Sequence, residues 1–273
     1  MRLGVVLDPA PGADAPLHDL VAQAQAAERA GLDFAWLREA EGGGPPLLTA
    51  AALGPATTTL RPVACVAASE HPLAVAEAAA VADTITNGRL VLAVRGDDAA
   101  VLGESADALV AALAARPFRH EGERWTIPAL RPENDGATER IVVTPPPVQA
   151  ELPLWLAGSA APAVAPARGL PHVVETAATS PTPTGRVRPA LRALEPDFDA
   201  DALVAALRAD QAAWGCDVTV LVPPPALPLA ARLRAIERLA TRVKPRVVQV
   251  PLPDGLEADW AAELDARIAA LSD

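Results

Sequence analysis

The apolar positions of the chain fall into short continuous runs, separated by stretches with helical spacing. A short apolar run that does not alternate with polar residues is typical of a parallel strand covered on both faces. Eight runs are therefore predicted as strands: 3–8, 33–38, 60–67, 89–94, 152–157, 172–176, 217–222 and 246–251.

The stretches between several of these runs carry apolar residues three and four positions apart, as in an amphipathic helix. The clearest stripes are Leu229, Leu233, Ile236, Leu239 and Val243, and then Leu256, Trp260, Leu264, Ile268 and Leu271. An earlier stripe over 17–24 ends before Gly31, a residue type that commonly closes helices. Repeated strand–helix alternation favours an α/β fold of the (β/α)8 TIM barrel type over an open doubly wound sheet.

We expect a single domain over residues 1–273, with two interruptions of the rhythm. The segment at about 116–150 has the pattern of a hairpin or excursion. The segment at about 177–200 is rich in proline, threonine and arginine, and is expected to be an irregular loop. Neither is long enough to form a second domain.

Charge and composition narrow the range of partners. The net charge of −11 argues against nucleic acid or an anionic membrane surface as the main partner. No signal segment is recognised, and no apolar run approaches the ~20 residues of a membrane span. Cys65 and Cys216 lie in or beside apolar runs and are expected to pack as free thiols. These features predict a cytoplasmic protein.

In a TIM barrel the active site collects at the carboxyl ends of the strands, so the sequence itself provides the candidates. Asp8, Glu39, Ser69 and Glu175 lie at or just beyond the carboxyl ends of predicted strands and are candidates for the substrate pocket or for proton transfer. Trp36 is a candidate pocket wall, although its place inside a strand also fits the core. No histidine or cysteine lies at metal-ligand spacing, so no metal is expected.

Arg95 and Gly96 follow the fourth predicted strand. A glycine lets a ligand approach the backbone, and an arginine at a barrel mouth suits a phosphate or a carboxylate. Asp97 and Asp98 either balance Arg95 or cap the next helix. A small anionic ligand is thus compatible with the acidic chain if this part of the mouth is positive.

Gly158 and Ser159, in "AGSAA", end a strand and open a helix. Backbone N–H groups there, with the serine hydroxyl, could bind an anion, or Ser159 could simply cap the helix. The stretch lacks the second glycine of a G-x-S-x-G nucleophile elbow, which disfavours a hydrolase.

His71 precedes Pro72, so it either caps the next helix or faces a ligand. Glu39 and Glu41 lie just before the glycine run 42–44, which is either a lid or a plain loop.

Four segments together resemble the bacterial luciferase-like monooxygenases, which use a flavin or the deazaflavin coenzyme F420. They are "AAERAGLDFAWLRE" (26–39), "HPLAVAEAAAVADTITNGRLVLAV" (71–94), "FRHEGERWTIP" (118–128) and "LPLWLAGSAAPAVAPARGLPHVV" (152–174). The resemblance implies a barrel whose mouth holds FMN or F420, with the phosphate near Arg95, Gly96, Gly158 and Ser159. It also implies an oxidoreductase acting on a small organic substrate, with His71 and Glu39 near the cofactor ring, and a homodimer or a pairing with a related subunit.

Two alternatives remain open at this stage. The histidine that usually follows strand two in that family is missing from "REAEGGG", and the loops are short. A non-catalytic barrel without a cofactor, serving as a partner subunit or ligand-binding protein, would share these features. An unrelated barrel isomerase or lyase would instead depend on Asp8, Glu175 or Glu39 and bind no flavin.

Overall fold

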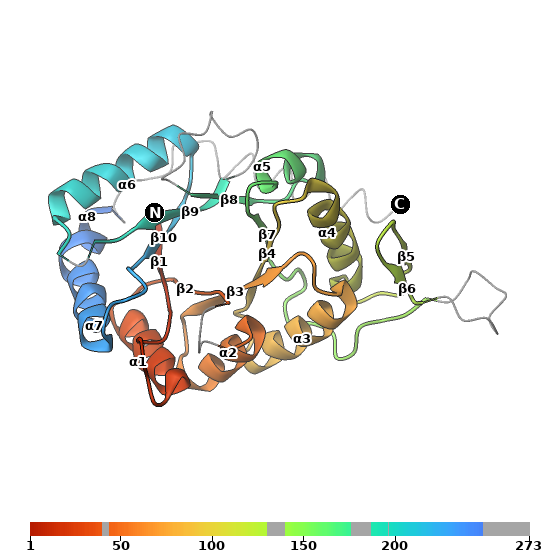
Figure 1. Ribbon diagram of the computed structural model, residues 1–273, viewed down its shortest axis with the longest axis horizontal. Coiled ribbons are helices and arrows are strands. Elements are labelled where there is room, and N and C mark those ends of the chain that lie inside the picture. Colours follow the sequence, from red (N-terminus) through yellow and green to blue (C-terminus); the bar gives the residue numbers. More distant parts are fainter. Residues whose placement is uncertain (40–43, 130–139, 176–186, 196, 248–273) are drawn as a thin grey trace.

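The computed structural model describes residues 1–39, 44–129, 140–175, 187–195 and 197–247. Within these ranges, parallel strands close into a barrel in the order β1-β10-β9-β8-β7-β4-β3-β2 (Figure 1). The strands are β1 (Arg2–Val6), β2 (Phe34–Leu37), β3 (Arg61–Ala67), β4 (Val91–Arg95), β7 (Leu154–Ala157), β8 (His172–Glu175), β9 (Val187–Ala193) and β10 (Val218–Val222). The predicted (β/α)8 barrel is confirmed.

Helices surround this barrel (Figure 1). They are α1 (Pro16–Arg29), α2 (Pro46–Leu53), α3 (Pro72–Ile85), α4 (Ala99–Leu113), α5 (Ala161–Val164), α6 (Ala200–Trp214), α7 (Leu229–Arg238) and α8 (Lys244–Val247), with short 3-10 segments at Gly54–Ala56 and Pro166–Arg168 and a π-helical segment, η3, at Leu239–Val243. Proline in the first turn of α1, α2 and α3 supplies the backbone φ angle that a helix start requires. Among the helices of the described ranges, none has both the length and the apolar character needed to cross a membrane.

The predicted excursion contains an antiparallel hairpin, β5 (His120–Glu121) and β6 (Thr126–Ile127), which lies outside the barrel beside α4 (Figure 1). The carboxylate of Glu104 on α4 accepts hydrogen bonds from the backbone N–H groups of Arg124 and Trp125. This contact fixes the hairpin, and with it Arg124, against the outer layer of the barrel.

The prediction of an irregular loop at 177–200 was wrong in part, because β9 (Val187–Ala193) lies there and pairs with both β8 and β10. Its sequence, VRPALRA, hides the strand because it contains a proline and two arginines. The pairing with β8 has an irregular register between His172 and Val174, opposite the part of β9 that contains Pro189. A bulge of this kind is a usual place for a proline inside a sheet.

The prediction of an eighth strand at 246–251 was also wrong over the described part, since α8 covers Lys244–Val247. Leu239, Val243 and Val247 are all buried and lie four positions apart, so they continue the apolar face of a helix. The two adjacent valines at 247–248, which favour a strand, hide this helical spacing in the sequence. Residues 248–251 and the predicted stripe from Leu256 to Leu271 lie outside the described residues.

Two apolar layers hold the barrel together. One lies between the sheet and the alanine-rich helices, and the other fills the lumen. The lumen layer comprises Val6, Phe34, Trp36, Val63, Cys65, Val91, Ala93, Trp155, Ala157, Val173, Val218 and Val220. The Trp155 ring stacks on Trp36 with centroids 6.3 Å apart and tilts against Phe34 at 5.6 Å. A lumen packed in this way leaves its carboxyl-end mouth as the place for a ligand.

Candidate functional site

Charged side chains gather where β1 to β4 open into the mouth. Side chains alternate along a strand, so the inward positions of Val6, Trp36 and Ala93 place Asp8, Arg38 and Arg95 on the same side, one step nearer the mouth. The Cys65 thiol lies just below: its burial raises its pKa to about 12, while the charges of Arg95 and Arg38 act to lower the pKa and that of Glu39 to raise it. Arg38 and Arg95 therefore face the upper lumen, and Glu39 lies near enough for its charge to act on the thiol.

Asp8 is held in a buried ion pair. Its carboxylate accepts hydrogen bonds from Arg38 Nε at 3.2 Å and Nη2 at 2.8 Å, and its backbone oxygen accepts one from Gln23. Asp8 is 4% exposed, whereas about a third of the Arg38 side chain reaches solvent. The pair presents the guanidinium of Arg38, rather than the carboxylate of Asp8, to the mouth.

The loops that follow β4 and β7 pack backbone against backbone. Gly158 has a φ of +94°, and a Cβ there would lie 2.4 Å from the backbone oxygen of Gly96. The Gly96 N–H also donates to Ala157 at 3.0 Å. Only glycine allows this approach and this backbone conformation. Gly96 and Gly158 are thus brought together as predicted, and the first role visible for them is to join the two loops.

Ser159 neither caps a helix nor offers vacant donors. Its N–H and its hydroxyl both donate to Oδ1 of Asp97, at 2.9 Å and 2.8 Å. The N-cap of α5 is Ala160, without a side-chain cap bond. Asp98 caps α4 by accepting from the N–H groups of Ala100 and Val101. Of the two aspartates, one therefore caps a helix and the other bridges to the next loop.

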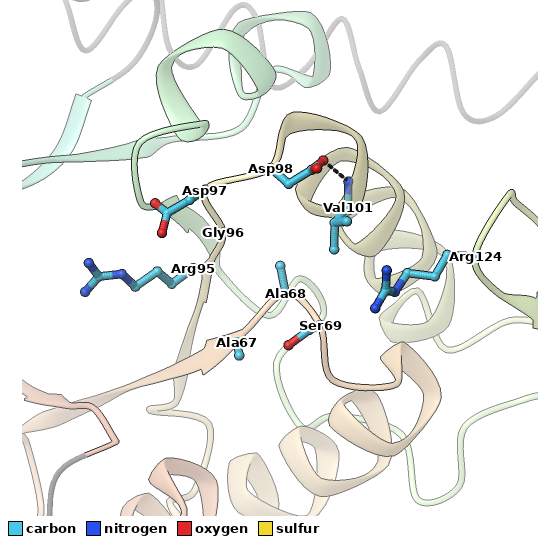
Figure 2. Close-up of a pocket in the computed structure, with 9 residues that line it drawn as sticks. All are labelled: Ala67, Ala68, Ser69, Arg95, Gly96, Asp97, Asp98, Val101 and Arg124. Carbon is cyan, nitrogen blue, oxygen red and sulfur yellow. Dashed lines mark hydrogen bonds between the residues drawn. The ribbon is translucent and has the colours of Figure 1, made fainter.

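A cavity of about 310 Å³ opens beside this cluster. It is lined by Ala67, Ala68, Ser69, Arg95, Gly96, Asp97, Asp98, Val101 and Arg124. Figure 2 shows Arg95 and Arg124 on opposite sides, with Asp97 above Arg95. The structure thus brings Ser69, Arg95 and Gly96 to one cavity, and its lining includes a second arginine, which comes from the hairpin.

The remaining predicted residues are not part of the lining of this cavity. His71 caps α3, because its Nδ1 accepts the Leu73 N–H at 3.3 Å, and the residue is exposed. Glu39 is exposed at the end of β2. Trp36 is 2% exposed and packs in the lumen layer, which agrees with the core position that its place inside a strand also allowed. Glu175 ends β8, and its side chain lies outside what the structure describes.

The sequence did not reveal the roles of two residues that line the cavity, Arg124 and Asp97. Arg124 lines the cavity from a hairpin whose position cannot be predicted from the local sequence. Asp97 accepts hydrogen bonds from Ser159, which lies 62 positions away in the sequence. Within the described ranges, no group of three or more histidine, cysteine, aspartate or glutamate side chains could hold a metal ion.

Comparison with solved structures shows the same fold at low identity. Monooxygenase RslO1 from Streptomyces bottropensis has a TM-score of 0.69 and 18% identity, covering 90% of this chain and 99% of that one. The oxygenating constituent of 3,6-diketocamphane monooxygenase from Pseudomonas putida, in complex with FMN, gives 0.66 and 16%, over 93% and 99%. The coenzyme F420-dependent tetrahydromethanopterin reductase from Methanopyrus kandleri gives 0.65 and 14%, over 90% and 99%.

Comparison with curated proteins gives no match. The model of a protein family described as luciferase-like monooxygenase matches residues 1–195. That range contains β1 to β9, and with them every candidate residue of the mouth. The chain therefore belongs to the luciferase-like monooxygenase family.

Proposed function

We propose that the protein is a flavin- or deazaflavin-dependent oxidoreductase acting on a small organic molecule. Family membership over residues 1–195 supports the class, and structural neighbours include one in complex with FMN and one dependent on F420. When bound, such a cofactor supplies hydride transfer or oxygen activation. The protein supplies its binding, its orientation and the exclusion of water.

The observation that carries the proposal is the donor set at the ends of β4 and β7. The N–H and hydroxyl of Ser159 already hold an anionic oxygen, that of Asp97, beside the Arg95 guanidinium. A carboxylate oxygen stands in here for a phosphate oxygen, so the residues present fit a phosphate-bearing cofactor. Arg95 and Ser159 would bind the phosphate, and Gly96 and Gly158 would keep the two loops in register.

His71 and Glu39 are proposed to act on protons at the mouth. Because His71 Nδ1 accepts the Leu73 N–H, a neutral ring carries its proton on Nε2 and can donate it. Glu39 is exposed beside Arg38, and its carboxylate can accept a proton. Asp8, Ser69 and Glu175 are proposed as neighbours of the substrate, with Asp8 acting through Arg38.

A binding experiment tests the proposal. We expect FMN or F420, oxidised or reduced, to quench the fluorescence of the protein or of the cofactor saturably at micromolar concentration. Arg95→Ala should weaken that binding about tenfold or more, because it removes a charge-assisted bond. Arg234→Ala, at an exposed position of α7, is the matched control. Absence of binding by all four forms would overturn the proposal, and binding without turnover of any substrate would favour the non-catalytic barrel.

We also propose that the protein works in the cytoplasm and pairs with a second copy or a related subunit. Both Cys65 and Cys216 are buried free thiols, which suits a reducing compartment. Val81 and Ile85 on α3 and Val110 on α4 are large apolar side chains at 44%, 45% and 50% exposure. These three residues, on neighbouring helices, offer an apolar surface for a subunit contact.

A further inference from the structure

Asp97 holds the donors that a cofactor phosphate would use. Its Oδ1 takes both bonds of Ser159, and the cavity with Arg95 and Arg124 opens next to it. The backbone and hydroxyl bonds from Ser159, and then the charge of Arg95, hold the pKa of the Asp97 carboxyl below its ordinary value. The carboxyl is therefore an anion at neutral pH.

If a ligand displaces the Asp97 carboxylate from Ser159, the backbone of Asp97 still stays at the edge of the site. Asp97 follows Gly96, whose backbone is pressed against Gly158, and it precedes Asp98, which caps α4. Its side chain is exposed and can turn away from Ser159, but its Cα stays in the same loop. A phosphate that takes over the Ser159 donors is then bound next to the loop that carries the negative charge of Asp97.

The resulting repulsion depends on the charge of the phosphate, because Coulomb energy is proportional to each charge. A phosphate monoester carries about −1.5 to −2 near pH 7. A phosphodiester carries a single negative charge. FMN ends in a monoester, whereas the phosphate of coenzyme F420 is a diester and continues into an acidic tail.

The cavity has room and charge for such a continuation. Its lining runs from the loop that carries Asp97 past Ser69 and Val101 to Arg124, and Figure 2 shows the Arg95 and Asp97 side chains on the other side of that loop, so a continuation would reach Arg124 by passing over the loop. A monoester ends at the phosphate and leaves Arg124 unused. The second substituent of a diester can follow the cavity, and Arg124 can pair with a carboxylate on it.

We propose that Asp97 is a specificity-determining residue that disfavours a phosphate monoester, so that the mouth selects a deazaflavin with a phosphodiester tail over FMN. This inference rests on the proposed function, since it presumes that a flavin-like cofactor binds at the mouth. It adds the choice between the two cofactors and names the residue that makes it.

The test is equilibrium binding of FMN, riboflavin and F420, all oxidised, to the wild type, Asp97→Asn and Asp97→Ala. Asn keeps the shape and an acceptor for Ser159 but removes the charge, whereas Ala removes both. Glu77→Gln, at an exposed position of α3, removes one charge elsewhere. Thermal unfolding of each variant confirms that it is folded.

We expect the wild type to bind F420 about tenfold or more tightly than FMN. Both Asp97 variants should gain about tenfold or more in FMN affinity and change by less than about threefold for riboflavin, which has no phosphate. Glu77→Gln should match the wild type.

Two results would overturn the inference while leaving the proposed function intact. One is a wild type that binds FMN at least as tightly as F420. The other is an FMN affinity that rises only in Asp97→Ala, since Asp97 would then merely occlude Ser159. Failure of every variant to bind any of the three compounds would overturn the proposed function as well.

Discussion

At the scale of single residues, several acidic side chains hold loops and helix ends in place by accepting hydrogen bonds from backbone N–H groups. Glu104 fixes the hairpin, Asp98 caps α4, and Asp97 bridges to Ser159. Glu28 is the strongest case: one carboxylate oxygen accepts from the N–H groups of Thr58, Thr59 and Leu60. The loop before β3 is thereby tied to α1 at the end of the barrel opposite the mouth.

Stability at acidic pH should depend on Glu28. Its burial acts to raise its pKa, but the three backbone donors outweigh burial and lower the pKa from 4.5 to about 2. Since the folded pKa lies below the unfolded one, the ionised carboxylate stabilises the fold above pH 4.5, and this contribution is lost as the pH falls towards 2. Discounted for solvent screening at this partly exposed site, the contribution is about 1 kcal/mol.

Urea denaturation of Glu28→Gln between pH 7 and pH 2 measures this effect. The variant should be less stable than the wild type by about 1 kcal/mol at neutral pH, and the difference should close at the acidic end. Glu77→Gln controls for the loss of one charge. A gap between Glu28→Gln and wild type that stayed constant with pH would show that the carboxylate charge is not the cause.

Sequence reasoning identified local roles at this scale and missed distant ones. The capping roles of His71 and Asp98 could be predicted, because a cap and its partners lie within three residues. The partner of Asp97 could not, since the bond to Ser159 depends on how the loops after β4 and β7 meet. Arg38 ends the predicted strand 33–38, but its pairing with Asp8 depends on the register of β1 and β2, which the sequence alone does not give.

At the scale of elements, strands were predictable where they are apolar and covered, and not where charges take part in the packing. Runs that became β1 to β4, β7, β8 and β10 follow the pattern of a buried parallel strand. β9 does not, because Arg192 points to a partner rather than to solvent. Asp210 on α6 supplies that partner, with bonds of 2.7 Å to Nε and 2.6 Å to Nη2.

Asp210→Asn should destabilise the protein by about 2–3 kcal/mol, because Asp210 is 5% exposed and its loss leaves the Arg192 charge largely buried without its carboxylate. Asp201→Asn is the matched control: Asp201 lies on the same helix and pairs with Arg246, but its side chain is 82% exposed, so about 0.5 kcal/mol or less is expected. Chemical denaturation of both variants measures the difference. Equal effects would mean that the β9–α6 pair contributes no more than a surface ion pair.

At the scale of the whole molecule, the closed barrel was predictable from the alternation of strands and helices, whereas the proposed dimer depends on surface side chains. Val81, Ile85 and Val110 stand out because they are large exposed apolar side chains on α3 and α4, two helices rich in alanine. An apolar surface on two adjacent helices suits a second copy better than water.

Val81→Glu combined with Val110→Glu should convert the proposed dimer into a monomer at micromolar concentration, since two charges on each partner would be buried at the contact. Sedimentation velocity measures the change in mass. Leu17→Glu, at an equally exposed position of α1, should leave the wild-type assembly in place. A wild type that sediments as a monomer, or a double variant that remains a dimer, would contradict the proposed surface.

The strand order has a consequence for how the chain is made. β1, the first strand, pairs with β2 on one side and with β10, the last described strand, on the other. While the protein emerges from a ribosome, the edges of β1 and β9 both lack a neighbour until residues 218–222 have been synthesised. An unpaired edge invites pairing with another chain. During synthesis the barrel therefore stays open between β1 and β9. It closes only when β10, a strand of five residues, pairs with both.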